Sequence, residues 1–197
     1  MNTTLNTTGC YRGGGYIQTS TGRMFCVTEP TPDQIHLEDI ANAAAKLCRF
    51  GGHVSHFYSV GQHAALCGIE AHRLELDPNT VRACFLHDAS ESFVADLVRP
   101  IKLLPGFQQY REIESRIQAA VWERFCVDYC PVTAAAVKRI DNQLLRCEAR
   151  CLMPDQGNGW DWSDTEDIGL TIKPIENWRD VKTFYLLSML ELGGIRP

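Results

Sequence analysis

Four side chains of the types that bind metal ions lie within apolar stretches of the sequence. His87 and Asp88 are adjacent, His63 precedes them, and Asp141 follows much later in the chain. Unpaired imidazole and carboxylate groups are costly to bury, so each needs a partner inside the protein. Two nitrogen and two oxygen ligands can surround one divalent cation and leave positions open for water and a substrate oxygen. The set therefore predicts a catalytic metal site.

The chemistry of such a site is hydrolytic. A bound cation lowers the pKa of its water to about 7 in favourable cases, which gives a hydroxide nucleophile, and it stabilises charge on a phosphoryl oxygen. Glu91 lies four residues after His87, on the same helical face. A histidine-aspartate pair is also common by chance, and on its own His87 would be a core histidine bonded to a neighbour.

Longer stretches around these positions resemble the HD superfamily of phosphohydrolases. The order His63, His87-Asp88, Asp141 looks like the H…HD…D signature of that family. The sequence HDASESFVADLVRPIK at 87–102 is similar to the HDASE…GDLP.P.K stretch of bacterial 5'-deoxynucleotidases and phage dATP triphosphohydrolases. The motifs CRF at 48–50 and YSVGQH at 58–63 resemble their arginine-aromatic pair and their S-V-x-[EQ]-H approach to the first ligand.

The resemblance implies a metal centre with a defined ligand set. The ligands would be His63, His87, Asp88 and Asp141, and Asp96 would orient water or support a second cation. Mixed imidazole and carboxylate ligation accepts cobalt, manganese, zinc, iron or magnesium, so the identity of the divalent metal ion stays open.

The resemblance also implies roles for residues that act on the substrate. Glu91 would be the general acid or base, Arg49 and Lys102 would contact phosphate oxygens, and Phe50 would pack against the sugar. Two of these residues have simpler interpretations. Arg49 could be a cation at the end of a helix, where it complements the dipole, and Lys102 could be solvated.

The implied reaction is attack of metal-bound hydroxide on the α-phosphorus of a deoxynucleoside 5'-phosphate. A monophosphate substrate makes the protein a 5'-deoxynucleotidase, and a triphosphate makes it a dNTP or dATP triphosphohydrolase; the sequence leaves both open. Base preference is open too, because Gly51-Gly52 replace bulkier residues of some dATP-selective relatives. Two other classes remain: a non-catalytic HD-domain sensor that binds nucleotide and metal, and a helical interaction module whose His87-Asp88 pair is structural.

Composition limits the partners. The chain has 197 residues, 45% of them hydrophobic and 22% charged, which is typical of one globular domain. The formal net charge of −5 argues against binding a nucleic-acid polymer, which usually requires a basic surface. No apolar run approaches the roughly eighteen residues that a membrane span requires, so a cytoplasmic protein is expected. The relatives imply a homo-oligomer.

The elements that must position these residues are helices. Periodicity predicts an all-α HD-domain helical bundle with a short N-terminal β-hairpin, divided into a tail and hairpin (1–31), a metal-binding helical core (32–152), and an acidic loop with a C-terminal helix (153–197). Ser59 and Gln62 form a capping-box pattern. The glycine triplet 13–15 is interpreted as a flexible linker. The expected hairpin strands are 16–19 and 24–27, and the expected helices are 32–51, 59–74, 80–95, 110–125, 132–151 and 176–192.

Overall fold

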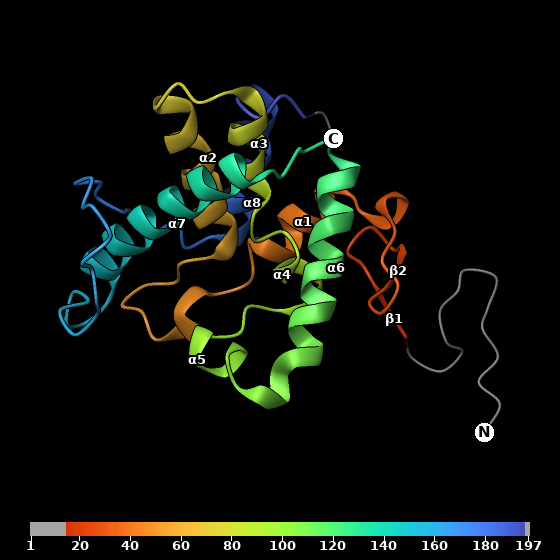
Figure 1. Cartoon of the computed structure of the whole chain (residues 1–197), viewed down its shortest axis with the longest axis horizontal. Coiled ribbons are helices and arrows are strands. Elements are labelled where there is room, and N and C mark those ends of the chain that lie inside the picture. The colour runs from red at the N-terminus through yellow and green to blue at the C-terminus, as the bar shows by residue number, and fades with distance from the viewer. Residues whose placement is uncertain (1–14, 196–197) are drawn as a thin grey trace.

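A two-stranded hairpin precedes a bundle of helices (Figure 1), so the predicted fold class is confirmed. This computed structural model describes residues 15–195; the preceding tail and most of the glycine triplet 13–15 lie outside the described residues. Within that range no helix is both long and apolar enough to cross a membrane. The elements are β1 (Tyr16–Gln18), β2 (Met24–Cys26), α1 (Leu37–Ala44), α2 (Val60–Arg73), α3 (Pro78–Leu86), α4 (Glu91–Val94), α5 (Arg99–Lys102), α6 (Gln108–Arg124), α7 (Pro131–Leu152) and α8 (Trp178–Glu191).

The hairpin is fixed to the helices through its turn and one aromatic ring. Its strands pair antiparallel, with Ile17 opposite Phe25. In the turn, the Thr21 backbone N–H and hydroxyl both donate to the Asp39 carboxylate on α1, at 2.8 and 2.7 Å. Phe25 stacks on Phe93 of α4 with ring centroids 4.1 Å apart. The hairpin therefore packs against α1 and α4. In the sequence, α1 precedes the candidate residue Arg49, and α4 begins at the candidate residue Glu91.

Close packing of α2 against α3 brings the two candidate histidines together. A Cβ atom at Gly68 of α2 would lie 2.3 Å from ring carbons of Phe85 on α3, so only glycine permits this approach. The starts of both helices are capped: Ser59 Oγ accepts from the Gln62 N–H at 3.1 Å, and the Asp77 carboxylate accepts from two backbone N–H groups. Because Gly68 lets the two helices approach closely, the first turn of α2 lies beside the last turn of α3.

The predicted helix 32–51 is wrong at both ends. A short 3-10 turn (Pro32–Gln34) precedes α1, and α1 itself ends at Ala44. The chain then pairs with the segment before α2: the Arg49 N–H donates to the Tyr58 carbonyl and the Val60 N–H to the Leu47 carbonyl, both at 2.9 Å. Arg49 begins a 3-10 turn that ends at Gly52. It is therefore not a cation at a helix end, and the dipole interpretation fails.

The predicted helix 80–95 is broken, and the break falls at His87-Asp88. α3 ends at Leu86, and a series of turns leads into α4. The His87 Nδ1–H donates to the Cys84 carbonyl at 2.8 Å, the group that would accept from the Asp88 N–H if the helix continued. The pair thus lies at the end of α3, where both side chains can face other helices.

The remaining helix predictions agree with α2, α6, α7 and α8 to within a few residues. The segment 153–177 has no regular helix and lies along α7, where Arg150 Nη2 donates to the Leu170 carbonyl at 2.9 Å. One half of the predicted capping box is wrong. The Gln62 side chain bonds to this segment, donating to the Lys173 carbonyl at 2.8 Å and accepting from the Ile175 N–H at 2.9 Å, so it does not cap its own helix.

Candidate active site

Four side chains from α2, α7 and the end of α3 meet at one point. His63 Nε2 lies 3.2 Å from His87 Nε2, 3.4 Å from Asp141 Oδ1 and 3.6 Å from Asp88 Oδ2. His87 Nε2 lies 3.3 Å from Asp88 Oδ2 and 3.9 Å from Asp141 Oδ1. Ligand atoms that surround one cation at about 2.0 to 2.2 Å are themselves about 3 to 3.5 Å apart, or somewhat more when opposite one another. The spacing fits a shared divalent ion.

Hydrogen bonds orient both imidazoles with Nε2 toward this point. The Nδ1–H of His63 donates to Glu148 Oε1 at 2.6 Å, and that of His87 donates to the Cys84 carbonyl at 2.8 Å. Metal-bound histidines commonly have this arrangement. Since both Nδ1 atoms carry the hydrogen, two Nε2 lone pairs face each other, and their close approach requires a proton or a cation between them. Burial opposes protonation, but the charge and hydrogen bond of Asp88, together with the charge of Asp141 and the Cys84 carbonyl, outweigh it and raise the pKa of His87 to about 9.

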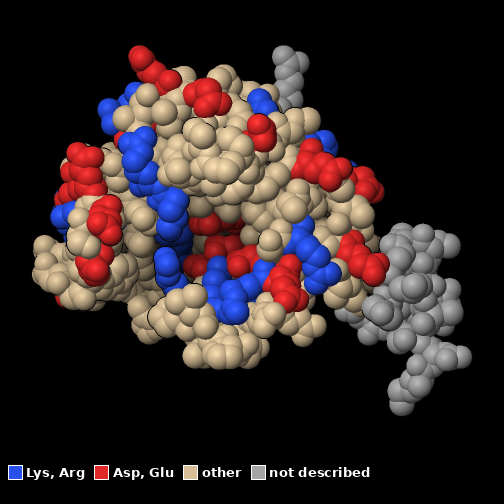
Figure 2. All heavy atoms as spheres, viewed as in Figure 1, with Lys and Arg blue, Asp and Glu red and all other residues tan. Residues whose placement is uncertain are grey.

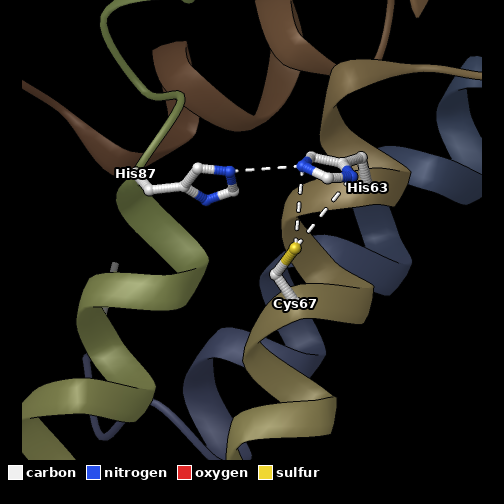
Figure 3. A group of neighbouring side chains, drawn as sticks. All are labelled: His63, Cys67 and His87. Atoms are coloured by element: carbon white, nitrogen blue, oxygen red, sulfur yellow. Dashed lines mark hydrogen bonds between the residues drawn. The ribbon is translucent and has the colours of Figure 1, made fainter. Parts of the chain in front are cut away.

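Cys67 is a further candidate ligand, one turn along α2 from His63. His63, Cys67 and His87 form a buried group that could hold a metal ion (Figure 3), with Cys67 Sγ 3.6 Å from His63 Nε2. Burial raises the pKa of the Cys67 thiol well above its usual range, whereas the imidazoles outweigh burial and lower the pKa values of Asp88 and Asp141. The carboxylates are thus ready to bind a cation, while the thiol must first lose its proton.

Glu148 is a buried residue that sequence reasoning missed. It is fully enclosed on α7, where it accepts from His63 and, at 2.8 Å, from the Tyr58 hydroxyl; Arg49 Nη2 lies 3.1 Å from its other oxygen. Burial raises its pKa, but the charges of Arg49 and His63 and the hydrogen bonds of His63 and Tyr58 together outweigh that effect and lower the pKa below its usual value. One sequence signal could have identified it. Glu148 follows Asp141 by seven residues, which is about two helical turns and places both on one face of α7.

Arg49 lies next to the four converging side chains, whereas the Phe50 ring lies on the Arg49 guanidinium and does not line the cavity described below. Arg49 Nη1 is 3.4 Å from Asp88 Oδ2, so the guanidinium is paired with two carboxylates, those of Asp88 and Glu148. Phe50 adopts a left-handed backbone conformation, with φ 56°, and its ring centroid lies 6.1 Å from that of Trp160. The aromatic wall predicted for the sugar is therefore shared with the acidic segment.

A cavity of about 520 Å³ opens beside the end of α3. Figure 2 shows a hollow on this face of the molecule, with acidic side chains at its floor and basic side chains at its edge. The cavity is large enough for a small phosphorylated ligand. Its lining residues come from the turn after α3, from α5 and from one face of α6, and they are His87, Asp88, Ser90, Glu91, Lys102, Arg111, Glu114, Ser115, Gln118, Ala119, Trp122 and Tyr129.

Glu91 lines this cavity beside Lys102. Its side chain is buried, and one oxygen, Oε2, has no hydrogen bond. Burial, followed by the charges of Asp88 and Asp96, raises the pKa of Glu91 to about 9, although Lys102 opposes the shift. A carboxylic acid with that pKa carries its proton at pH 7, the form that a general acid needs and that a general base must first lose.

Lys102 and Asp96 are placed differently from expectation. Lys102 Nζ lies 3.0 Å from Glu91 Oε1 and 2.7 Å from Glu114 Oε1, so it is paired with carboxylates rather than solvated. Among residues 15–195 no hydrogen bond or ion pair joins Asp96 to either imidazole. The left-handed conformation of Ala95, with φ 70°, ends α4 and redirects the chain before Asp96. Asp96 influences Glu91 through its charge alone.

Comparison with known proteins gives relatives but no activity. No family model matches the sequence. The chain is 37% identical to the uncharacterized protein YfdR of Escherichia coli over 147 residues, which cover 74% of this chain and 76% of YfdR. It is 34% identical to the uncharacterized protein RCAP_rcc00048 of Rhodobacter capsulatus over 137 residues, 65% of this chain and 68% of that protein. By this extent of shared sequence, the chain belongs to the protein family of YfdR.

Proposed function

We propose that this protein is a divalent-cation-dependent phosphohydrolase of the HD type that acts on deoxynucleoside 5'-phosphates. One observation carries the proposal: His63, His87, Asp88 and Asp141 converge from separate helices, with the two Nε2 atoms 3.2 Å apart, beside a cavity that Glu91 lines. A structural histidine-aspartate pair does not need a second imidazole and a distant carboxylate at the same point.

The four converging side chains would hold the cation, and the carboxylates would partly neutralise it. When bound, a divalent cation activates a water molecule and stabilises negative charge on a phosphoryl oxygen. The ligand types fit manganese, cobalt, iron, zinc or magnesium equally well. A second cation near Asp96 belongs to the proposal only as an extension, because Asp96 lies apart from the imidazoles.

The residues around the cation would divide the remaining work. Arg49, held in place by Glu148, offers its guanidinium to a phosphate oxygen. With a monophosphate substrate, a water oxygen forms a bond to phosphorus, the bond from phosphorus to O5' breaks, and protonated Glu91 supplies the proton that the leaving O5' takes up; the proton lost by the water then restores Glu91 to its acid form. Lys102 keeps Glu91 in position at 3.0 Å. Phe50 would pack against the sugar.

The test is product analysis with a substrate panel. Purified protein is incubated with Mn²⁺, Co²⁺ or Mg²⁺ and with ribo- and deoxynucleoside mono- and triphosphates, and products are separated by chromatography. We expect a deoxynucleotide to be hydrolysed and His87→Ala to abolish turnover. His56→Ala is the matched control, because His56 is 60% exposed and paired with Glu176 away from the cavity.

The panel also separates the rival functions. Bound metal and bound nucleotide without any product would favour the non-catalytic sensor over the hydrolase. Absence of bound metal by elemental analysis, together with no turnover after metal addition, would contradict both and leave a structural role for His87-Asp88.

A further inference from the structure

The cavity has an aromatic region to which the proposed chemistry assigns no role. Trp122 and Tyr129 stack with ring centroids 4.6 Å apart and planes 15° from parallel, and both line the cavity that contains His87 and Glu91. Tyr129 is 41% exposed. Trp122 follows Glu114, the partner of Lys102, by eight residues on α6, a rise of about 12 Å. The aromatic pair therefore lies well along the cavity from the Lys102 end.

Small side chains leave space between these two regions of the cavity. Ser115 and Ala119 occupy the same face of α6 as Trp122 and also line the cavity. Gln118, between them, is fully engaged: it accepts from the Ser90 N–H at 3.0 Å and donates to the Leu86 carbonyl at 2.8 Å. Gln118 thus fixes the turn after α3 against α6 and gives the cavity a rigid wall.

Tyr129 is held in place before any ligand arrives. The Asp128 N–H donates to the Asn79 side-chain oxygen at 2.8 Å, and the Asn79 amide donates back to the Asp128 carbonyl at 2.9 Å. The Val127 N–H donates to the Trp122 carbonyl at 2.9 Å. These bonds fix the connection between α6 and α7, so little conformational entropy is lost when a ligand contacts the ring.

The polar atoms of the two aromatic rings remain available. No hydrogen bond within residues 15–195 uses the Tyr129 hydroxyl or the Trp122 indole N–H. A cavity wall that combines an exposed aromatic face with unused donors matches a planar, polar, aromatic ligand, and a nucleobase has this chemistry.

We infer that Trp122 and Tyr129 form the subsite for the base of the nucleotide, which stacks on this aromatic pair while its phosphate lies at the end of the same cavity that His87 and Asp88 line. The inference rests on the proposed function for the position of the phosphate. Every nucleobase has a π-face, so stacking tolerates different bases. The subsite therefore predicts activity on both purine and pyrimidine deoxynucleotides, with selectivity left to the donors at the ring edges.

The first experiment compares substrates with and without a base. KM is measured for dAMP, dTMP and 2-deoxyribose 5-phosphate with the unaltered protein and with Tyr129→Leu. Loss of one stacking partner raises KM for the two nucleotides by roughly tenfold or more and leaves 2-deoxyribose 5-phosphate unchanged. Tyr129→Phe retains the ring, so KM should rise much less than in Tyr129→Leu, and a difference between dAMP and dTMP would report contact of the hydroxyl with the base. Tyr16→Leu is the matched control, because Tyr16 is 39% exposed and lies on the hairpin.

The second experiment measures binding without turnover. Dissociation constants for dAMP and dTMP are determined by calorimetry with Mn²⁺ on a Glu91→Gln background, with and without Tyr129→Leu, after circular dichroism shows that each variant is folded. Weaker nucleotide binding in the Tyr129→Leu variant supports the subsite even if the unaltered protein hydrolyses nothing, a result that would overturn only the hydrolase. Unchanged dissociation constants, or no nucleotide binding at all, would overturn the subsite.

Discussion

Buried charge is concentrated around His63. Arg49 and Glu148 are both enclosed, and each contacts one of the side chains that converge at the candidate metal site. A charged side chain that is left unpaired in a buried network costs much free energy, because the surrounding medium has a low dielectric. The members of such a network therefore hold one another in fixed positions. The orientation of His63 and the position of the Arg49 guanidinium consequently depend on the same carboxylate.

Glu148→Gln tests this dependence. The substitution removes the charge that fixes the Nδ1–H of His63, and we expect metal affinity to fall by roughly 10- to 100-fold. Calorimetric titration with Mn²⁺ measures the affinity, and ¹⁵N NMR of the imidazoles in metal-free protein reports the His63 tautomer. Glu191→Gln is the control, because Glu191 is exposed. Unchanged affinity and an unchanged tautomer would show that Glu148 has no positioning role.

The pH dependence of turnover tests the role of Glu91. Because the pKa of Glu91 is raised to about 9, the proton-donating form is present below that pH and is lost as the pH rises through it. We therefore expect an alkaline limb in the profile of kcat, and because a cation bound at Asp88 would offset the charge of that carboxylate, the limb should lie below pH 9. Lys102→Met removes a charge that lowers the pKa of Glu91, so the limb should move to higher pH, whereas Lys182→Met, which breaks a pair with Glu38, should not move it. A limb that Lys102→Met leaves in place would mean that another group titrates.

The sequence predicted the residues of the site better than their contacts. Residue type and apolar surroundings identified His63, His87, Asp88 and Asp141, because polar groups in such positions need partners. The role of Lys102 depends on Glu114, and the pairing of these two side chains becomes visible only once α5 and α6 are placed against each other. Glu148 had no neighbouring motif, and only its spacing from Asp141 pointed to it.

At the level of elements, the contact between α2 and α3 sets the separation of the two imidazoles. Gly68→Ala places a methyl group 2.3 Å from the present ring carbons of Phe85, so the helices must separate or the ring must shift. We expect the free energy of unfolding in urea to fall by about 1 to 3 kcal/mol and metal affinity to fall with it.

Two further variants decide whether the cause is this contact. Gly106→Ala adds a methyl group where nothing lies within 4 Å, so it should leave stability near that of the unaltered protein. Adding Phe85→Leu to Gly68→Ala should restore part of the loss, because the smaller side chain makes room. A double variant no more stable than the sum of the single effects would contradict the packing explanation.

Both wrong helix predictions lie beside the site, and they share a cause. The apolar periodicity of 32–51 and 80–95 is helical, but competing hydrogen bonds end the helices early. The strand-like pairing of Arg49 with Tyr58 interrupts the first, and the His87 imidazole takes a helical acceptor in the second. The periodicity of apolar residues indicates which face of a segment is buried. It does not show where a side chain takes the place of a backbone N–H in a helical hydrogen bond.

For the whole molecule, the candidate metal site joins α2, the end of α3 and α7. A cation that binds these elements together only in the folded state adds stability by mass action, about 2.7 kcal/mol at a concentration one hundred times Kd. We expect saturating Mn²⁺ to raise Tm by roughly 5 to 10 °C for a protein of this size, and EDTA to reverse the rise. His87→Ala should remove the response, and a Tm that ignores Mn²⁺ would contradict a site that spans three helices.

Gln62 joins the C-terminal part of the chain to the helix that carries the candidate metal ligand His63. Gln62 directly precedes His63 in the chain. Its side-chain amide donates to the Lys173 carbonyl and accepts from the Ile175 N–H. A fragment truncated after Leu152 would retain every proposed ligand, yet it would expose that amide and loosen the first turn of α2. Limited proteolysis within 155–172 that separates the two parts should therefore abolish the proposed hydrolysis, although the first fragment retains all four proposed metal ligands.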